Sequence, residues 1–267
     1  YILTKMTETG MSYEAALEEA TQLGYAEADP TADVEGYDAG RKIAIMASLA
    51  FNSRVTFSQV YTEGITKITA DDISYAKEFG YVIKLLGVAR NTQSGIEVKV
   101  HPMLIPQEHP LAGVRESLNA VFVHADAMDD AMFMGRGAGQ MPTASAVMGD
   151  VLEVARHVQM GIKPIVGCTC TDKLPLISMD ELHTKYYIRF VVADRPGVLA
   201  AAADIFSRND VSVRTVTQRG NAAREDVDLV FVTHTAEERS VRKAIEEILT
   251  LEGVVTGGAP SVIRVQD

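Results

Sequence analysis

Residues 23–44, LGYAEADPTADVEGYDAGRKIA, concentrate acidic side chains ahead of a basic pair. The acids are Glu27, Asp29, Asp33, Glu35 and Asp38, and the basic residues are Arg41 and Lys42. Such a run could be a solvated turn, a cation site or part of an active site. Asp, Glu, Gly and Pro favour turns, so composition alone supports the first interpretation. A calcium loop counted from Asp29 would place Val34 where glycine is needed and no acid at the twelfth position.

The catalytic interpretation depends on where Lys42 lies. It follows Asp38 by one helical turn, and the next residues, IAIMASLAF, are apolar almost all round, which predicts a buried helix. The Lys42 ammonium should then be partly desolvated and kept charged by the Asp38 carboxylate. A lysine placed in this way can act as a general acid. Glu27 and Asp33, on the preceding loop, could hold a substrate ammonium group.

Length and charge narrow the class of protein. The chain has 267 residues, enough for two domains, and a net charge of -11, which disfavours nucleic acid and membrane surfaces as partners. It has no apolar run long enough to span a bilayer and no signal-peptide pattern at the N-terminus, so we expect a cytoplasmic protein. The only cysteines, Cys168 and Cys170, form a C-x-C pair without a histidine cluster, and we expect reduced thiols and no metal site.

Residues 1–165 have the pattern of an α+β layer. Ser12 to Leu23 predicts a helix that Gly24 ends, and Thr69 with Asp72 predicts a capping box. Strands are expected at 81–89, 95–105, 119–126 and 131–135, forming a mixed sheet with helices on one face. In the second strand Ile96, Val98 and Val100 alternate with Glu97, Lys99 and His101, so one face should be wet. A long helix should follow the glycine loop at 135–139.

Residues 166–184 show little periodicity and are expected to be a linker. Residues 185–267 then read β-α-β-β-α-β, which predicts a ferredoxin-like domain. Along 226–231, Val227, Leu229 and Phe231 alternate with more polar positions, as expected where helices cover one face of the sheet.

Two long motifs resemble one family. YAEADPTADVEGYDAGRKIAI resembles the substrate-site segment of homoserine dehydrogenases, and GRGAGQMPTASAVMGDV resembles their later glycine-loop segment. The opening YILTKM also resembles the helix after that family's G-T-T-N turn. With the regulatory domain that follows, the resemblance covers essentially the whole chain.

The resemblance implies an enzyme that interconverts aspartate 4-semialdehyde and homoserine with NAD(P)H, in the pathway to threonine, isoleucine and methionine. By position, Glu27 and Asp33 would hold the substrate's amino group. Asp38 would order the polar network at the reacting carbonyl, and Lys42 would protonate the nascent alkoxide. This fits the chemistry, because hydride arriving at an aldehyde leaves negative charge on oxygen that a nearby ammonium stabilises.

The same resemblance implies a nucleotide-binding unit with a G-x-G-x-x-G motif, and this chain has none. We therefore expect the chain to be a C-terminal portion of the enzyme, inactive alone, that holds the substrate half of the site and the dimerisation sheet. Gly135, Gly137 and Ala138 would approach the nicotinamide end of the cofactor. Whether NAD or NADP is preferred, and whether an aspartate kinase precedes the chain, stays open.

ADRPGVLAAAADIF, residues 193–206, resembles the first turn of an ACT domain, an amino-acid-sensing module. Helix N-termini can bind a carboxylate, and the resemblance implies effector contacts from Arg195, Gly197, Asn209 and Val211. Threonine is the implied effector, and edge-to-edge pairing implies a homodimer or higher oligomer. A non-catalytic regulatory or dimerisation module containing an ACT domain is the alternative function.

Overall fold

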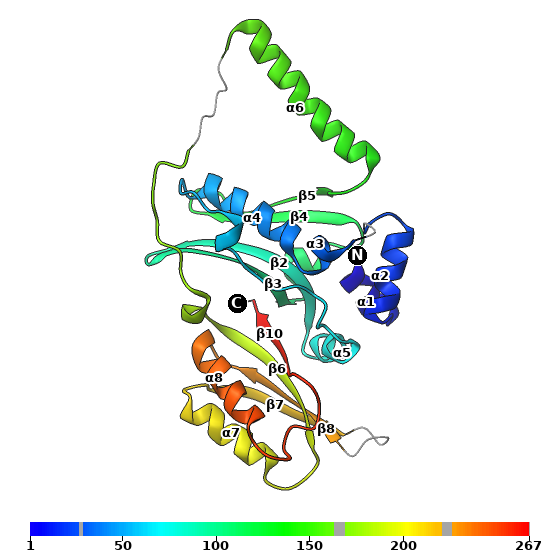
Figure 1. Cartoon of the computed structure of the whole chain (residues 1–267), viewed down its shortest axis with the longest axis vertical. Helices are drawn as coiled ribbons and strands as arrows, with labels where there is room; N and C mark the ends of the chain where they lie inside the picture. Colours follow the sequence, from blue (N-terminus) through cyan, green and yellow to red (C-terminus); the bar gives the residue numbers. More distant parts are fainter. Residues whose placement is uncertain (27–28, 163–168, 221–225, 267) are drawn as a thin grey trace.

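The computed structural model describes residues 1–26, 29–162, 169–220 and 226–266, which form two α+β parts that share one sheet (Figure 1). The N-terminal part contains α1 (Ile2–Thr9), α2 (Tyr13–Gln22), α3 (Thr31–Val34), α4 (Tyr37–Ala50), η1 (Phe57–Gln59), β1 (Tyr61–Thr62), α5 (Ala70–Glu78), β2 (Tyr81–Thr92), β3 (Gly95–Pro106), η2 (Pro110–Gly113), β4 (Leu118–Ala125), β5 (Asp129–Arg136) and α6 (Gln140–Met160). The C-terminal module contains η3 (Met179–Glu181), β6 (His183–Ala193), α7 (Val198–Arg208), β7 (Val213–Gly220), β8 (Asp226–Thr233), β9 (Ala236–Glu237), α8 (Glu238–Leu249) and β10 (Ser261–Val265).

Two predicted helix starts are confirmed by their hydrogen bonds. The Ser12 hydroxyl accepts from the Ala15 N–H at the start of α2. At the start of α5 the Thr69 hydroxyl accepts from the Asp72 N–H, and the Asp72 carboxylate accepts from the Thr69 N–H. Each bond satisfies an N–H group that the first turn of a helix leaves without a partner. The predicted caps therefore fix where these helices begin.

One sheet runs through both parts in the order β1-β3-β10-β6-β8-β7, and β2 pairs with β3. Strand β10 joins the two parts: it lies parallel to β3, with Arg264 opposite Met103, and antiparallel to β6, with Ile263 opposite Tyr187. Within the module the order β10-β6-β8-β7 places the fourth strand beside the first, which is the ferredoxin-like order that the sequence predicted. The proposed boundaries at 165 and 184 are crossed by this sheet and stay a prediction.

Hydrophobic residues of the module are buried on both faces of its sheet. Helices α7 and α8 cover one face with Ala202, Phe206 and Ile248, as the alternation predicted. The opposite face carries Tyr187, Val230 and Ile263, which belong to a core cluster that also includes residues of α1, α2 and α5. The N-terminal part therefore covers the face that the module's own helices leave open.

Strand β3 is buried on both sides, so the expected wet face is wrong. Lys99 and His101 are buried together with Ile96, Val98 and Val100. The physical reason is that both faces are covered: α4 packs on Ile96, Val98 and Val100, while Leu182, Thr184 and Arg264 lie around Lys99 and His101. Alternation identified the two faces, but it could not identify what covers the second one.

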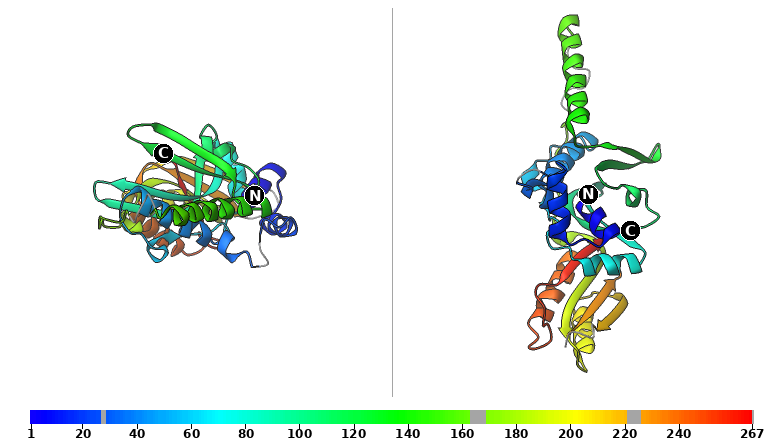
Figure 2. Two further views of the ribbon diagram at one scale, coloured as in Figure 1. Left: turned by 90° about the horizontal axis from the view of Figure 1, so that it is seen from above. Right: turned by 90° about the vertical axis from the view of Figure 1, so that its right-hand side faces the viewer.

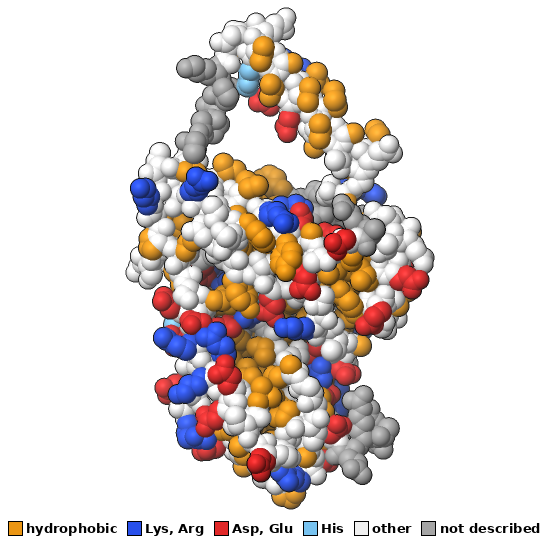
Figure 3. All heavy atoms as spheres, viewed as in Figure 1, with side chains coloured by type: hydrophobic (Ala, Val, Ile, Leu, Met, Phe, Trp, Pro, Cys, Tyr) orange, Lys and Arg blue, Asp and Glu red, His pale blue; other side chains and the backbone are white. Residues whose placement is uncertain are grey.

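Strands β4 and β5 form a separate antiparallel hairpin, and α6 projects away from the rest of the chain (Figures 1 and 2). None of the residues of α6 is buried, although many are apolar (Figure 3). The exposed apolar side chains of the hairpin and helix include Phe133, Met134, Met141, Val147, Val151, Val154 and Val158. A patch of this extent is typical of a surface that contacts another polypeptide.

The segment before the module lies along the N-terminal part. The Leu174 N–H donates to the Ser53 hydroxyl, and the Ile96 N–H donates to the Pro175 carbonyl oxygen. The Ile177 N–H in turn donates to the Ile96 carbonyl oxygen. The described end of the predicted linker is thus hydrogen-bonded to β3 rather than free.

Candidate functional site

The acidic run folds into a short loop, the single turn of α3 and the start of α4. Glu27, one of the predicted substrate-binding residues, lies outside the described residues. Asp29 accepts hydrogen bonds from the N–H and the hydroxyl of Thr31, which hold the beginning of α3 and lower the pKa of the Asp29 carboxyl. Asp29 therefore has a local structural contact.

Gly36 sets the angle between α3 and α4. Its φ of 76° lies in the left-handed region, and a Cβ there would stand 3.1 Å from Val100 Cγ1 on β3. Only glycine adopts this conformation without cost and leaves room for the strand. One turn later, a Cβ on Gly40 would stand 2.7 Å from the Phe57 ring. The start of α4 is therefore pressed closely against β3 and η1.

Asp38 and Lys42 form the ion pair that their spacing predicted. Lys42 Nζ donates to Asp38 Oδ2 at 2.5 Å, one turn apart on α4. Asp38 lies in the first turn, where the helix dipole favours a negative charge. The Lys42 side chain is 59% exposed and the Asp38 side chain is 46% exposed. In this chain the Lys42 ammonium is therefore not desolvated, and that expectation is wrong.

The reason is that α4 has one covered side only. Ile43, Ala44 and Ala47 are buried in a cluster with β3 residues, as expected for a packed helix. Ile45 and Leu49 are exposed, so the expectation of a helix buried all round is wrong. Lys42 projects from the uncovered side. Within the described residues, nothing covers its ammonium on that side.

Asp33 lies on α3, exposed, and precedes Gly36 in the tight connection to α4, in which the Gly36 N–H donates to the Asp33 carbonyl oxygen. The turn brings α3 and the first turn of α4 next to each other in one compact unit. Asp33 and Asp38 thus sit on either side of one glycine turn. Glu35 lies between them and closes the end of α3.

The predicted cofactor-contacting residues lie at the end of β5 and in the loop to α6. Gly135 is opposite Asn119 in the hairpin, and a Cβ on Gly137 would stand 2.3 Å from Asn119 Nδ2. Ala138 is exposed beside Gly139, which begins α6 with no side-chain cap. The backbone of this loop is exposed and can contact the edge of a dinucleotide. Within the described residues the loop does not enclose a phosphate-binding pocket.

The predicted effector-binding residues divide between the two ends of α7. Arg195 and Gly197 lie before the helix, and Gly197 begins it with φ 93°. Asn209 ends it, and its side-chain amide donates to the Ile205 carbonyl oxygen and to Glu247. Val211 is buried in the module core. The helix separates Gly197 from Asn209 by about 18 Å, so one chain does not bring the four residues into one small site.

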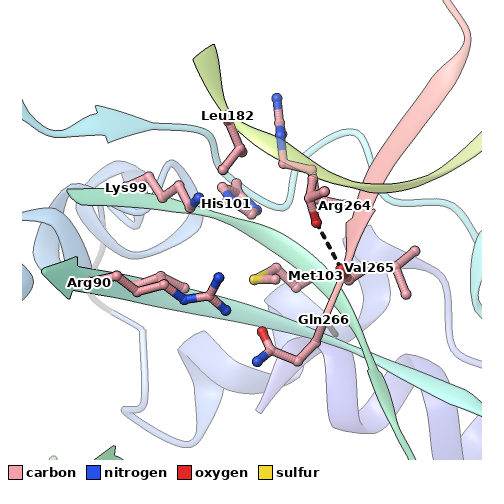
Figure 4. Close-up of a pocket in the computed structure, with 10 residues that line it drawn as sticks. Arg90, Lys99, His101, Met103, Leu182, Arg264, Val265 and Gln266 are labelled. Carbon is pink, nitrogen blue, oxygen red and sulfur yellow. Dashed lines mark hydrogen bonds between the residues drawn. The ribbon is translucent and has the colours of Figure 1, made fainter. Parts of the chain in front are cut away.

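A buried charged layer at the β3–β10 seam was not predicted (Figure 4). Arg264 donates to Glu238 and Glu63, and Lys99 pairs with Glu97. His101 Nδ1 lies 2.9 Å from the Pro102 carbonyl oxygen, and Nε2 has no hydrogen-bond partner among the described residues. Burial lowers the His101 pKa to about 3. The alternation along β3 did identify Glu97, Lys99 and His101 as polar residues on one face, but that face was predicted to be exposed to solvent.

Two further observations concern metal ions and membranes. Within residues 1–26, 29–162, 169–220 and 226–266 there is no group of three or more His, Cys, Asp or Glu side chains that could hold a metal ion. Over the same ranges no helix has both the length and the apolar character needed to cross a bilayer.

The structure is an α+β layer joined through one sheet to a ferredoxin-like module. The Asp38–Lys42 ion pair lies at the start of α4 in the layer. A family model described as homoserine dehydrogenase matches residues 1–152, and one described as ACT domain matches residues 186–253. The homoserine dehydrogenase of Corynebacterium glutamicum is 46% identical over 100% of this chain and 60% of its own length. That of Neisseria gonorrhoeae is 42% identical over 95% of this chain and 60% of its own length.

A solved homoserine dehydrogenase from Thiobacillus denitrificans has 39% sequence identity and a TM-score of 0.90, over 100% of this chain and 61% of that one. A solved homoserine dehydrogenase from S. aureus has 33% identity and a TM-score of 0.69. The chain belongs to the homoserine dehydrogenase family and carries an ACT domain, which confirms the resemblance. It spans about 60% of the length of the curated relatives it matches.

Proposed function

We propose that this chain supplies the substrate half of an NAD(P)-dependent homoserine dehydrogenase, which interconverts L-aspartate 4-semialdehyde and L-homoserine. The observation that carries the proposal is the Asp38–Lys42 ion pair at the start of α4, inside the segment that matches the family. It pairs a proton donor with a carboxylate on a helix that is fixed firmly by Gly36 and β3. The reaction belongs to the pathway to threonine, isoleucine and methionine, in the cytoplasm.

Lys42 acts as the general acid at the reacting oxygen. Its ammonium stabilises the charge that develops on the carbonyl oxygen of the semialdehyde and then protonates it. Asp38 orients the ammonium through the ion pair. In the reverse direction the neutral amine of Lys42 takes the proton from the homoserine hydroxyl.

Asp33 and Glu27 hold the ammonium group of the substrate. Asp33 lies on α3, and Glu27 precedes it in the same acidic run, so both carboxylates come from the segment that leads into α4. Charge complementarity with an ammonium group fixes the amino-acid end of the substrate. The aldehyde end then lies toward α4 and Lys42.

NAD(P), when bound, supplies or accepts the hydride. From this chain, Gly135, Gly137 and Ala138 contact the nicotinamide end through backbone groups, since glycines let a ligand approach closely. The phosphates and adenosine are held by a nucleotide-binding portion outside these residues. The open loop at the start of α6 agrees with such an edge contact.

The exposed apolar side chains of β4, β5 and α6 belong to contacts in the assembled enzyme. Phe133 and Val158 are mainly solvent-exposed in the single chain, at 65% and 76%. We assign the β4–β5 hairpin to a homodimer interface and α6 to packing against the nucleotide-binding portion. Burial of these side chains offers a sizeable hydrophobic stabilisation.

Threonine is the proposed effector of the ACT domain. In one chain Arg195 and Gly197 form the open end of α7, whereas Asn209 and Val211 are engaged in packing. The effector site therefore lies at the first end of α7. Threonine at millimolar concentration should raise the melting temperature of the full-length protein, and an unchanged melting curve would count against sensing.

A non-catalytic regulatory or dimerisation module is the second candidate. The solvent exposure of Asp38 and Lys42 favours it, because an ordinary surface ion pair would look the same. The deciding experiment is an assay of homoserine oxidation with NADP, run on the full-length protein and on residues 1–267 alone. We expect turnover by the full-length protein only. No turnover by the full-length protein would favour the regulatory module, and turnover by the 267 residues alone would contradict the division of the site.

A further inference from the structure

Arg264 lies at the place where the module meets the N-terminal part. Its side chain is 5% exposed, and the guanidinium makes three charged hydrogen bonds. Nε and Nη2 donate to the two carboxylate oxygens of Glu238 on α8, at 2.9 and 2.6 Å. Nη1 donates to Glu63 Oε2 at 2.8 Å, in the loop that follows β1. One side chain therefore ties the module helix to a loop of the N-terminal part.

Glu63 is held from several sides. The Tyr61 hydroxyl donates to Glu63 Oε2 at 3.0 Å, and the Arg264 guanidinium lies over the Tyr61 ring, 5.4 Å from its centroid. The Glu63 N–H donates to the Val100 carbonyl oxygen on β3 at 2.8 Å. The loop at Glu63 is thus a rigid continuation of the sheet, and Arg264 fixes its side chain.

The next two residues contact the substrate segment directly. A Cβ on Gly64 would stand 2.2 Å from the Val34 carbonyl oxygen and 2.5 Å from the Glu35 Cα, so the loop lies flat against the end of α3. The Ile65 N–H donates to the same Val34 oxygen at 2.8 Å. Any shift of the loop must therefore move the connection between Asp33 and Asp38.

We infer that Arg264 is a positioning residue for the substrate segment, acting through Glu63 and the Gly64–Ile65 backbone on the end of α3. Because its other partner is Glu238 on α8, the ACT domain is linked through it to the residues that hold the substrate ammonium group. As a statement about catalysis this inference rests on the proposed function, but the mechanical link does not.

A second buried ion pair provides a matched control. Arg189 of β6 and Asp72 of α5 also join the module to the N-terminal part, with Arg189 Nε donating to Asp72 Oδ1 at 2.8 Å. Their hydrogen bonds lead to Thr69 at the start of α5, to Tyr187 and to Asp228, and among the described residues none reaches positions 63–65. Loss of this pair should loosen the seam without moving α3.

The test is hydrogen exchange measured on the full-length protein for Glu63→Gln, Arg264→Met and Arg189→Met. Glu63→Gln is the milder variant, because Arg264 keeps both of its bonds to Glu238. In Glu63→Gln and Arg264→Met we expect the amides of residues 63–65 to exchange at least about fivefold faster, since the loop opens locally more often. Arg189→Met should accelerate exchange in α5 and leave residues 63–65 unchanged.

Kinetics on the same proteins give the second readout. Glu63→Gln should raise the KM for homoserine by at least about threefold with a smaller change in kcat, because the segment that binds the ammonium group is displaced. Arg189→Met should leave KM unchanged. Unaltered exchange at 63–65 in Glu63→Gln, or equal KM values in Glu63→Gln and Arg189→Met, would overturn the inference. If the wild-type protein does not oxidise homoserine, the proposed function fails, and the exchange data still decide the link.

Discussion

The start of α4 and the seam between α5 and β6 each carry an aspartate paired with a basic side chain, in opposite surroundings. The Lys42 and Asp38 side chains are 59% and 46% exposed, whereas the Asp72 side chain is fully buried and Arg189 is 9% exposed. Exposed pairs contribute little to stability, while removal of one partner from a buried pair is costly. The charges at the start of α4 are therefore open to solvent and to a substrate, whereas the charges between α5 and β6 hold the two parts together.

Removal of the buried charge between α5 and β6 should have the largest effect on stability. Asp72→Asn removes a charge that Arg189 and the Tyr187 hydroxyl contact. The Arg189 guanidinium would then stay buried without the negative charge of Asp72 beside it. This should lower the free energy of unfolding by about 3–5 kcal/mol, measured by urea denaturation. Asp71→Asn is the matched control, because Asp71 is exposed and lies 4.0 Å from Arg189. Equal losses in the two variants would break the contrast between buried and exposed charge.

The pH dependence of stability provides a second contrast, between buried His101 and exposed His124. Burial lowers the His101 pKa to about 3, so below its unfolded pKa of about 6.5 the unfolded state binds the proton more readily. Stability from this residue is complete above pH 6.5 and is lost as the pH falls. Between pH 7.5 and pH 5 the loss should be about 2 kcal/mol.

His101→Gln should remove this part of the acid sensitivity, measured as the difference in unfolding free energy at the two pH values. In His124 the pKa is raised by Asp130, so any contribution has the opposite sign and is lost as the pH rises. His124→Gln is therefore the control and should not reduce the acid sensitivity. An unchanged acid sensitivity in His101→Gln would mean that this histidine is not held neutral by its burial.

Much of the fold could be predicted because the signals are local. The capping box at Thr69 and Asp72 and the alternation of Val227, Leu229 and Phe231 each depend on residues close in sequence. The parallel pairing of β10 with β3 joins residues about 160 positions apart, Arg264 with Met103, and no local pattern encodes it. For the same reason the sequence did not reveal that Lys99 and His101 would be covered.

The sequence predicted the spacing of the charged residues at the candidate site, but it did not predict their exposure to solvent. The i, i+4 spacing of Asp38 and Lys42 puts both side chains on one face of a helix, and the ion pair forms as expected. The exposure of Lys42 was missed because apolar Ile45 and Leu49 suggested an interior position. Hydrophobicity shows that a surface needs cover, but it does not show whether the same chain supplies that cover.

The exposed face of α6 should affect assembly rather than folding. Val154 is 60% exposed in the single chain, so Val154→Asp should change the unfolding free energy of residues 1–267 by less than about 0.5 kcal/mol. In the full-length protein the charge should hinder packing of this helix against the nucleotide-binding portion, so the amides of α6 should exchange at least about tenfold faster. Glu153→Gln is the control on the same helix. Unchanged hydrogen exchange in Val154→Asp would show that α6 is a free surface.

The most direct measurement combines turnover and stability for Lys42→Met in the full-length protein. The account predicts that kcat for homoserine oxidation falls by about 10²–10⁴-fold, the usual contribution of a general acid or base. The free energy of unfolding should change by less than about 0.5 kcal/mol, because the Asp38–Lys42 pair is exposed. A variant that keeps the wild-type kcat would contradict the assignment of Lys42 as the proton donor.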